Sequence, residues 1–209
     1  MADANKLLGV VLFPHFENLD VFGPMQMFGN ALAAIGLERS VTVAQSDEPV
    51  CSTQGQRVVV DHGFDDCPEL DMLLIPGGIG TRTQVDNTEL TDWLGERAER
   101  ASLVMTVCTG TALLARTGKL DGHRATTNKL AFDWVAAQGP NVAWVKKARW
   151  VEDGKFVTSS GVSAGIDMAL GVIARLGGHE LAEMLASAAE YEWHRDASWD
   201  PFAEIHGLV

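Results

Sequence analysis

The stretch Ser102-Leu-Val-Met-Thr-Val-Cys108-Thr-Gly-Thr-Ala-Leu-Leu-Ala-Arg-Thr-Gly118 decides how this chain folds. Residues 103–107 form a mainly apolar run that is rich in β-branched side chains, which predicts a buried strand. Residues 111–117 follow a short helical pattern, and Gly118 comes next as a natural C-terminal cap. Cys108 lies at the junction. A sharp strand-to-helix turn there would hold its side chain above the sheet, in the manner of a nucleophile elbow.

Two interpretations of Cys108 are open at this point. A helix N-terminus beneath the sulfur would lower the pKa of the thiol and make it reactive. A free cysteine is otherwise commonly a buried and inert residue. The turn after a strand, with Gly110 close behind, favours the reactive interpretation.

The other cysteines, Cys51 and Cys67, are interpreted as structural. Three cysteines at positions 51, 67 and 108 form neither a disulfide framework nor a zinc-ligand spacing, so no metal site is expected. A reducing, cytoplasmic location is the simplest inference.

Composition limits the class of protein. The 209 residues are 46% hydrophobic and 21% charged, which predicts one folded domain over residues 1–209, with residues 194–209 as a C-terminal tail. The formal charge of −12 argues against a nucleic-acid partner, whose binding needs clustered lysine and arginine. Neither a signal peptide nor an apolar run of membrane-spanning length is recognisable, so no membrane partner is expected.

Apolar runs alternate with helical patterns along the chain. This alternation predicts an α/β fold with a mostly parallel central sheet covered on both faces. Hairpins are expected where Gly55 and Gly154 interrupt extended segments. The expected strands are residues 6–13, 39–45, 71–75, 102–107, 142–151 and 155–159, with a further short strand within residues 121–127. The expected helices are residues 21–34 (beginning at Val21 or Pro24), 87–100, 111–117, 129–138 and 180–193, with a long apolar helix that follows residues 160–167 and ends at residue 176.

Three unusual segments follow expected strands: the loop ending in Asp20, the pair Gly77-Gly78, and Cys108. Ligands of parallel sheets bind beyond the carboxyl ends of the strands, so these segments are expected to meet there. The glycine pair could be only a tight turn. Alternatively, its backbone N–H groups and that of Thr109 would form a pocket resembling an oxyanion hole.

A carboxylate is the expected partner of the cysteine. Asp20 could simply cap the following helix. If it faces Cys108, one of the two groups must hold a proton, and a protonated Asp20 would be a ready general acid. Glu17 is the rival for this role. None of the six histidines adjoins Cys108, although His15 could approach from the loop before Asp20. The sequence therefore favours cysteine–carboxylate chemistry over a cysteine–histidine triad.

Several motifs together resemble the ThiJ/PfpI superfamily, a group similar to the class I glutamine amidotransferases. They lie in the order expected for that superfamily and span residues 7–191. The motifs are L-F-P-x-F-x-x-L-D-x-x-G-P (12–24), L-L-I-P-G-G (73–78), V-C-T-G (107–110), L-x-G-x-x-A-T-T (120–127) and S-A-G-I-D (163–167).

The V-C-T-G motif and the L-D-x-x-G-P loop look most like the isonitrile hydratase subgroup. The resemblance implies a flavodoxin-like three-layer sandwich, a homodimer, Cys108 as the nucleophile and Asp20 as its acid partner. It also implies that Thr109 and Gly78 line and polarise the site. Relatives often carry histidine where this chain has Asn128, so Asn128 is a further candidate site residue.

The expected activity is the hydration of a small-molecule isonitrile to an N-substituted formamide, with neither a metal nor an organic cofactor. A glyoxalase, deglycase or amidase on the same scaffold is one alternative. A non-enzymatic sensor, in which Cys108 is oxidised or binds a ligand, is another.

Overall fold

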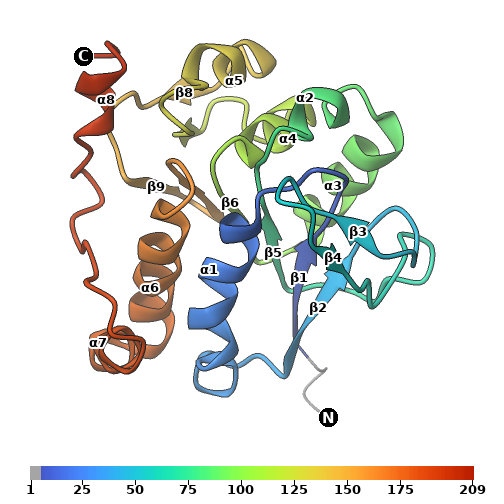
Figure 1. Cartoon of the computed structure of the whole chain (residues 1–209), viewed down its shortest axis with the longest axis horizontal. Coiled ribbons are helices and arrows are strands. Elements are labelled where there is room, and N and C mark those ends of the chain that lie inside the picture. Colours follow the sequence, from blue (N-terminus) through green and yellow to red (C-terminus); the bar gives the residue numbers. More distant parts are fainter. Residues whose placement is uncertain (1–5) are drawn as a thin grey trace.

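A six-stranded sheet forms the centre of the molecule in the computed structural model, which describes residues 6–209 (Figure 1). The strand order is β2-β1-β5-β6-β10-β9. The first five strands are parallel, and β9 pairs antiparallel with β10 at one edge. The parallel part has the order of a flavodoxin-like sheet. The strands are β1 Leu7–Val11, β2 Arg39–Val43, β5 Met72–Ile75, β6 Leu103–Thr106, β9 Trp150–Asp153 and β10 Phe156–Ser159.

The central strands are buried along their whole length. Every residue of β1, β5, β6 and β10 is buried, and the apolar runs of the sequence predicted this for the first three of these strands. Strands of this kind need helices on both faces, since neither face can be left to water.

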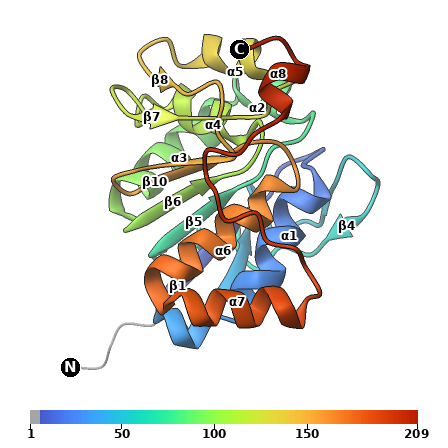
Figure 2. The ribbon, with the colours of Figure 1, turned by 90° about the vertical axis from the view of Figure 1, so that its left-hand side faces the viewer.

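Helices cover both faces of the sheet (Figure 2). On one face, α1 packs against α6, and α7 packs outside α6. On the other, α4 lies between α3 and α5. The fold is thus the three-layer α/β sandwich expected from the sequence. The helices are α1 Asn18–Gly29, α2 Thr81–Gln84, α3 Thr88–Arg100, α4 Gly110–Arg116, α5 Phe132–Gln138, α6 Ala164–Gly177, α7 His179–Ala188 and α8 Phe202–Ile205, with a 3-10 turn, η1, at Leu32–Ile35.

The remaining pairings are two expected hairpins and one short parallel pair. β3 (Val50–Cys51) and β4 (Arg57–Val58) form the first expected hairpin, and β9 and β10 form the second, with Gly154 at a φ of 61° in its turn. β7 (Arg124–Ala125) and β8 (Ala143–Trp144) pair in parallel.

Helix boundaries differ from the sequence prediction at several points. α1 begins at Asn18, so Pro24 lies inside the helix and Asp20 lies in its first turn. The expected end at residue 34 is replaced by the separate turn η1, which Gly36 closes at a φ of 79°. α5 begins at Phe132 instead of residue 129, and α7 ends at Ala188 instead of residue 193.

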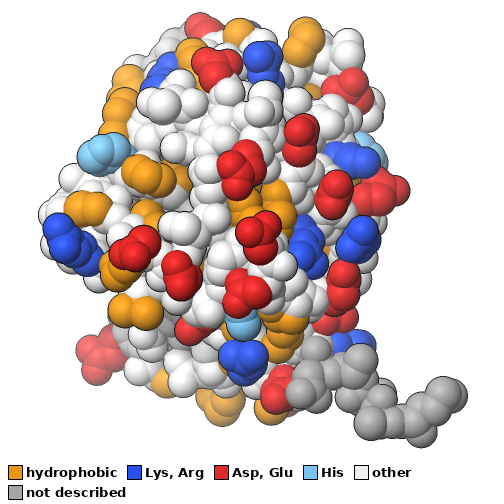
Figure 3. Space-filling model, turned by 90° about the vertical axis from the view of Figure 1, so that its right-hand side faces the viewer, with side chains coloured by type: hydrophobic (Ala, Val, Ile, Leu, Met, Phe, Trp, Pro, Cys, Tyr) orange, Lys and Arg blue, Asp and Glu red, His pale blue; other side chains and the backbone are white. Residues whose placement is uncertain are grey.

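Within the described residues, no helix is both long enough and apolar enough to cross a membrane. Acidic side chains are spread over the face drawn in Figure 3, in keeping with the net charge of −12.

Candidate active site

Cys108 occupies a strained turn between β6 and α4. Its φ is +56°, a conformation that residues other than glycine seldom adopt. Gly110 must follow, because a Cβ atom there would collide with the carbonyl oxygens of Ile75 and Pro76. These features are those of the predicted nucleophile elbow, and such strain is typical of functional sites.

Hydrogen bonds to the surrounding chain hold this strained backbone in place. The Cys108 N–H donates to the carbonyl oxygen of Ser160 at 3.0 Å. The Cys108 carbonyl oxygen accepts from the hydroxyl of Thr127 at 2.7 Å and from that of Thr111 at 3.3 Å. These hydrogen bonds fix the backbone of Cys108, and only 6% of the residue is exposed.

Three donors surround the sulfur: the backbone N–H groups of Val162 and Thr109 and the side-chain amide of Asn128. The Ala131 N–H donates to Asn128 Oδ1 at 3.0 Å, which leaves the Asn128 NH₂ group free to point toward Cys108. Sequence reasoning named Thr109 and Asn128 but missed Val162. Its φ of +39° is a marked outlier for a β-branched residue and brings its N–H to the sulfur.

Asp20 is fully buried beside Cys108. Its Oδ2 accepts a hydrogen bond from the Gly77 N–H at 2.8 Å, whereas Oδ1 has no partner of regular hydrogen-bond geometry among the described residues. The interpretation of Asp20 as a helix cap is wrong, because residue 17 occupies the N-cap position of α1. The predicted meeting of Asp20 with Cys108 is present in the structure.

Burial sets the protonation of this pair. It is the main cause that raises the pKa of Asp20 to about 8, and the charge of Glu17 adds to the rise. Burial also raises the pKa of the Cys108 thiol to about 12, together with the negative charge of Asp20. The sequence predicted a lowered thiol pKa from the helix N-terminus. Desolvation outweighs that effect here, so both groups hold their protons at neutral pH.

Gly77 and Gly78 act differently from the prediction. Their N–H groups do not point freely into the site: Gly77 donates to Asp20, and Gly78 donates to the Thr109 hydroxyl at 3.1 Å. A Cβ atom at Gly78, whose φ is +123°, would collide with the backbone of residues 15–17. The glycines thus position the acid and Thr109 by close backbone approach.

An open pocket of about 240 Å³ leads to the sulfur. His15, considered earlier as a partner for the cysteine, is exposed and does not line it, and Cys51 is also exposed, away from this pocket. The lining residues are Glu17, Gly78, Ile79, Arg82, Cys108, Thr109, Asn128, Ala131 and Val162.

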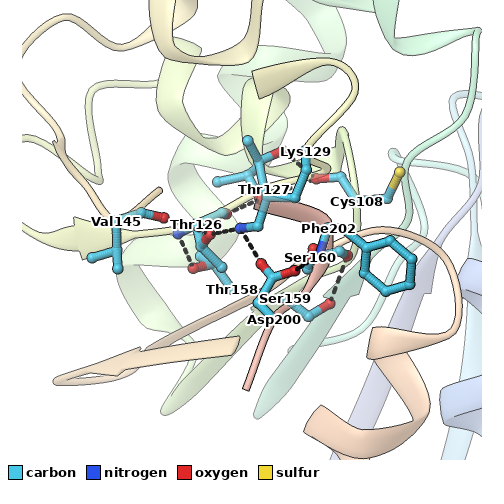
Figure 4. A network of polar contacts seen from close by, with 11 residues as sticks. Cys108, Thr126, Thr127, Lys129, Val145, Thr158, Ser159, Ser160, Asp200 and Phe202 are labelled. Atoms are coloured by element: carbon cyan, nitrogen blue, oxygen red, sulfur yellow. Dashed lines mark hydrogen bonds and ion pairs between the residues drawn. The ribbon is translucent and has the colours of Figure 1, made fainter. Parts of the chain in front are cut away.

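The C-terminal segment reaches the back of the elbow through a buried ion pair (Figure 4). Lys129 Nζ lies 3.1 Å from Asp200 Oδ2, and the two side chains are 1% and 0% exposed. Lys129 also donates to the hydroxyl of Thr126 at 2.6 Å. The neighbouring Thr127 and Asn128 contact the Cys108 carbonyl and sulfur, so this network supports the segment that surrounds the nucleophile.

Replacing Asn128 with leucine should slow alkylation of Cys108 by iodoacetamide. One of the three donors to the sulfur is lost, and hydrogen bonds to a charged group contribute about 1.5–3 kcal/mol, or roughly 10- to 100-fold in thiolate population. The rate is measured by mass spectrometry of the Cys108 peptide. Asn141→Leu, an exposed amide elsewhere, is the matched control and should alkylate at the wild-type rate. Equal rates in all three proteins would exclude a role for Asn128 at the sulfur.

Comparisons with known proteins point to one family. Residues 6–175 match the model of the DJ-1/PfpI family. Isonitrile hydratase of Pseudomonas putida is 34% identical over 184 residues, which are 88% of this chain and 78% of that protein. A crystal structure of a ThiJ/PfpI family protein from Pseudomonas syringae aligns with a TM-score of 0.81 at 31% identity, covering 90% of this chain and 76% of that one.

Other relatives have different names. The HTH-type transcriptional regulator GbdR of Pseudomonas aeruginosa is 29% identical over 88% of this chain, which spans only 50% of the regulator. The Parkinson disease protein 7 homolog of Danio rerio is 28% identical over 86% of this chain. Family membership alone thus leaves the activity open.

Proposed function

Because this chain belongs to the DJ-1/PfpI family, we propose that it is an enzyme in which Cys108 and Asp20 hydrate an isonitrile to an N-substituted formamide. One observation carries the proposal: a fully buried carboxyl group with a pKa raised to about 8 lies beside the nucleophile, without a histidine lining the pocket. The similarity to an isonitrile hydratase over most of both chains supports the choice of substrate.

The neutral Cys108–Asp20 pair suits the first step. The terminal carbon of an isonitrile has a lone pair and accepts the Asp20 proton, while the sulfur attacks the same carbon. The thiol proton passes to the carboxylate that Asp20 has become. The net change is addition of S–H to one carbon, which gives the thioimidate R–N=CH–S–Cys and regenerates the acid.

Water completes the reaction. It adds to the thioimidate carbon, and the nitrogen takes up a proton, which gives R–NH–CH(OH)–S–Cys. The C–S bond then breaks, releasing R–NH–CHO and the Cys108 thiol. The N–H groups of Thr109 and Val162 stabilise negative charge on the sulfur as it forms and as it leaves.

The proposal predicts a fall in activity above pH 8. The mechanism needs Asp20 protonated, and this proton is lost as pH rises through its raised pKa of about 8. We therefore expect kcat/KM to be level between pH 6 and 7.5 and then to fall by about tenfold per pH unit. A profile that stays level to pH 10 would contradict the role of Asp20 as acid.

Asp20→Asn is the matched variant for this prediction. It should lose turnover yet remain folded. The folded state holds the Asp20 proton more tightly than the unfolded state, so ionisation of Asp20 costs stability as pH rises from about 4 to about 8. The variant should accordingly gain stability relative to the wild type across that range, as measured by urea unfolding.

The direct test of the substrate is formamide production from cyclohexyl isocyanide by the reduced protein, followed by chromatography. Formation of N-cyclohexylformamide supports the proposal. No formamide, together with lactate from methylglyoxal without added cofactor, would replace it by a glyoxalase activity. Cys108 oxidation without turnover of either compound would indicate a sensor.

A further inference from the structure

Arg82 lines the pocket above Cys108 and has no carboxylate partner within residues 6–209. It lies on α2, directly after the glycine-rich turn, and its guanidinium group stacks over the ring of Trp134 at 3.6 Å from the centroid. Among the described residues it makes neither an ion pair nor a side-chain hydrogen bond. Most other arginines of the chain do pair with carboxylates: Arg97, Arg100, Arg116, Arg149, Arg175 and Arg195.

The position of Arg82 is tied to the nucleophile. The hydroxyl of Thr81 donates to the Gly78 carbonyl oxygen at 2.8 Å and to the Thr109 hydroxyl at 3.1 Å. Thr81 is fully buried, and it therefore fixes α2 to the residue that follows Cys108. Stacking on Trp134 limits the motion of the guanidinium group from the other side. Arg82 is exposed to solvent, and these contacts keep its guanidinium group at the pocket.

The charge of Arg82 stands out in its surroundings. The chain carries a net charge of −12, and the other charged residue that lines this pocket is Glu17, whose Oε1 accepts a hydrogen bond from Gln54. No ion pair joins Arg82 to Glu17. A planar guanidinium group with free N–H donors matches a carboxylate in a two-point contact.

We propose that Arg82 binds a carboxylate on the N-substituent of the substrate, so that the preferred substrates are isonitriles of carboxylic acids. This inference rests on the proposed isonitrile chemistry for the identity of the reacting group. The isonitrile carbon lies at Cys108, and the linear C≡N–R unit directs the substituent outward along the pocket. Arg82 then fixes the substituent and orients the carbon for attack.

Matched substrates test the proposal. We would compare kcat/KM for isocyanoacetate and for its neutral methyl ester in the wild type, Arg82→Met and Arg82→Lys. The wild type should have the higher kcat/KM for the acid. In Arg82→Met, kcat/KM for the acid should fall by about 10- to 100-fold, whereas kcat/KM for the ester should change by less than about twofold. The preference of Arg82→Lys for the acid should lie between that of the wild type and that of Arg82→Met. Arg57→Met, which removes an exposed arginine on β4, is the control and should keep the preference.

If Arg82 had only a structural role, replacing it would lower kcat/KM for both substrates alike. Equal losses on acid and ester, or an unchanged preference in Arg82→Met, would overturn the proposal. Turnover of the ester with no preference for the acid would overturn the role of Arg82 and leave isonitrile hydration standing.

A second measurement separates this proposal from the failure of isonitrile chemistry. Iodoacetate and iodoacetamide alkylate the same thiol but differ in charge. Mass spectrometry of the Cys108 peptide gives the rate with iodoacetate divided by the rate with iodoacetamide. That ratio should fall by about tenfold in Arg82→Met relative to the wild type, whether or not any isonitrile reacts. An identical ratio in both proteins would overturn anion recognition by Arg82.

Discussion

Cys108→Ala is expected to lower formamide production by roughly 10⁴-fold or more, since a covalent mechanism cannot proceed without its nucleophile. The fold should survive the change. The side chain loses only its sulfur, and the hydrogen bonds that hold the elbow come from the backbone of residue 108. Initial rates with cyclohexyl isocyanide measure the loss, and circular dichroism confirms the fold.

Cys51→Ala is the control for this experiment, because Cys51 is exposed and does not line the Cys108 pocket. It should retain wild-type turnover. A folded Cys108→Ala protein that still converts the isonitrile at more than about a tenth of the wild-type rate would exclude covalent catalysis by this residue.

The second large effect concerns stability. Lys129→Met should reduce the free energy of unfolding by about 3–5 kcal/mol, because it leaves the Asp200 carboxylate buried without its cation. Asp200 is buried, and among residues 6–209 the one hydrogen bond to its other oxygen comes from the N–H of Phe202. Urea unfolding measures the change.

The double variant Lys129→Met, Asp200→Leu provides the matched control. It removes both charges and should recover much of the lost stability, since apolar groups can replace a buried ion pair at little cost. A decrease of less than about 1 kcal/mol in the free energy of unfolding of Lys129→Met would show that hydration or protonation of Asp200 compensates for the missing cation. The ion pair would then not hold the C-terminal segment.

Much of the fold could be predicted because parallel strands are buried on both faces and read as uninterrupted apolar runs. The runs at residues 71–75 and 102–107 became β5 and β6, and the turn after β6 became the elbow. Asp20 and Cys108 were expected to meet because the carboxyl ends of parallel strands share one edge of the sheet. Helix boundaries were less predictable: Pro24 suggested a first turn but lies within α1.

The remaining parts of the site depend on tertiary contacts that no local pattern encodes. Val162 donates to the sulfur only because its backbone is held at a φ that its residue type disfavours. The partners of the Gly77 and Gly78 N–H groups depend on loops far apart in sequence. Lys129 and Asp200 look like two solvated charges in the sequence, yet they form a buried pair. The thiol pKa follows burial, which overrides the local helix effect.

Covalent catalysis by Cys108 is tested most directly by mass spectrometry of the Cys108 peptide during turnover of cyclohexyl isocyanide, with the reaction quenched at short times. The mass of the Cys108 peptide should rise transiently by that of one substrate molecule and return to its initial value as N-cyclohexylformamide appears. The adduct should be absent from Cys108→Ala. Formamide production without any adduct on Cys108, at a rate unchanged in Cys108→Ala, would contradict the claim that this thiol forms the thioimidate.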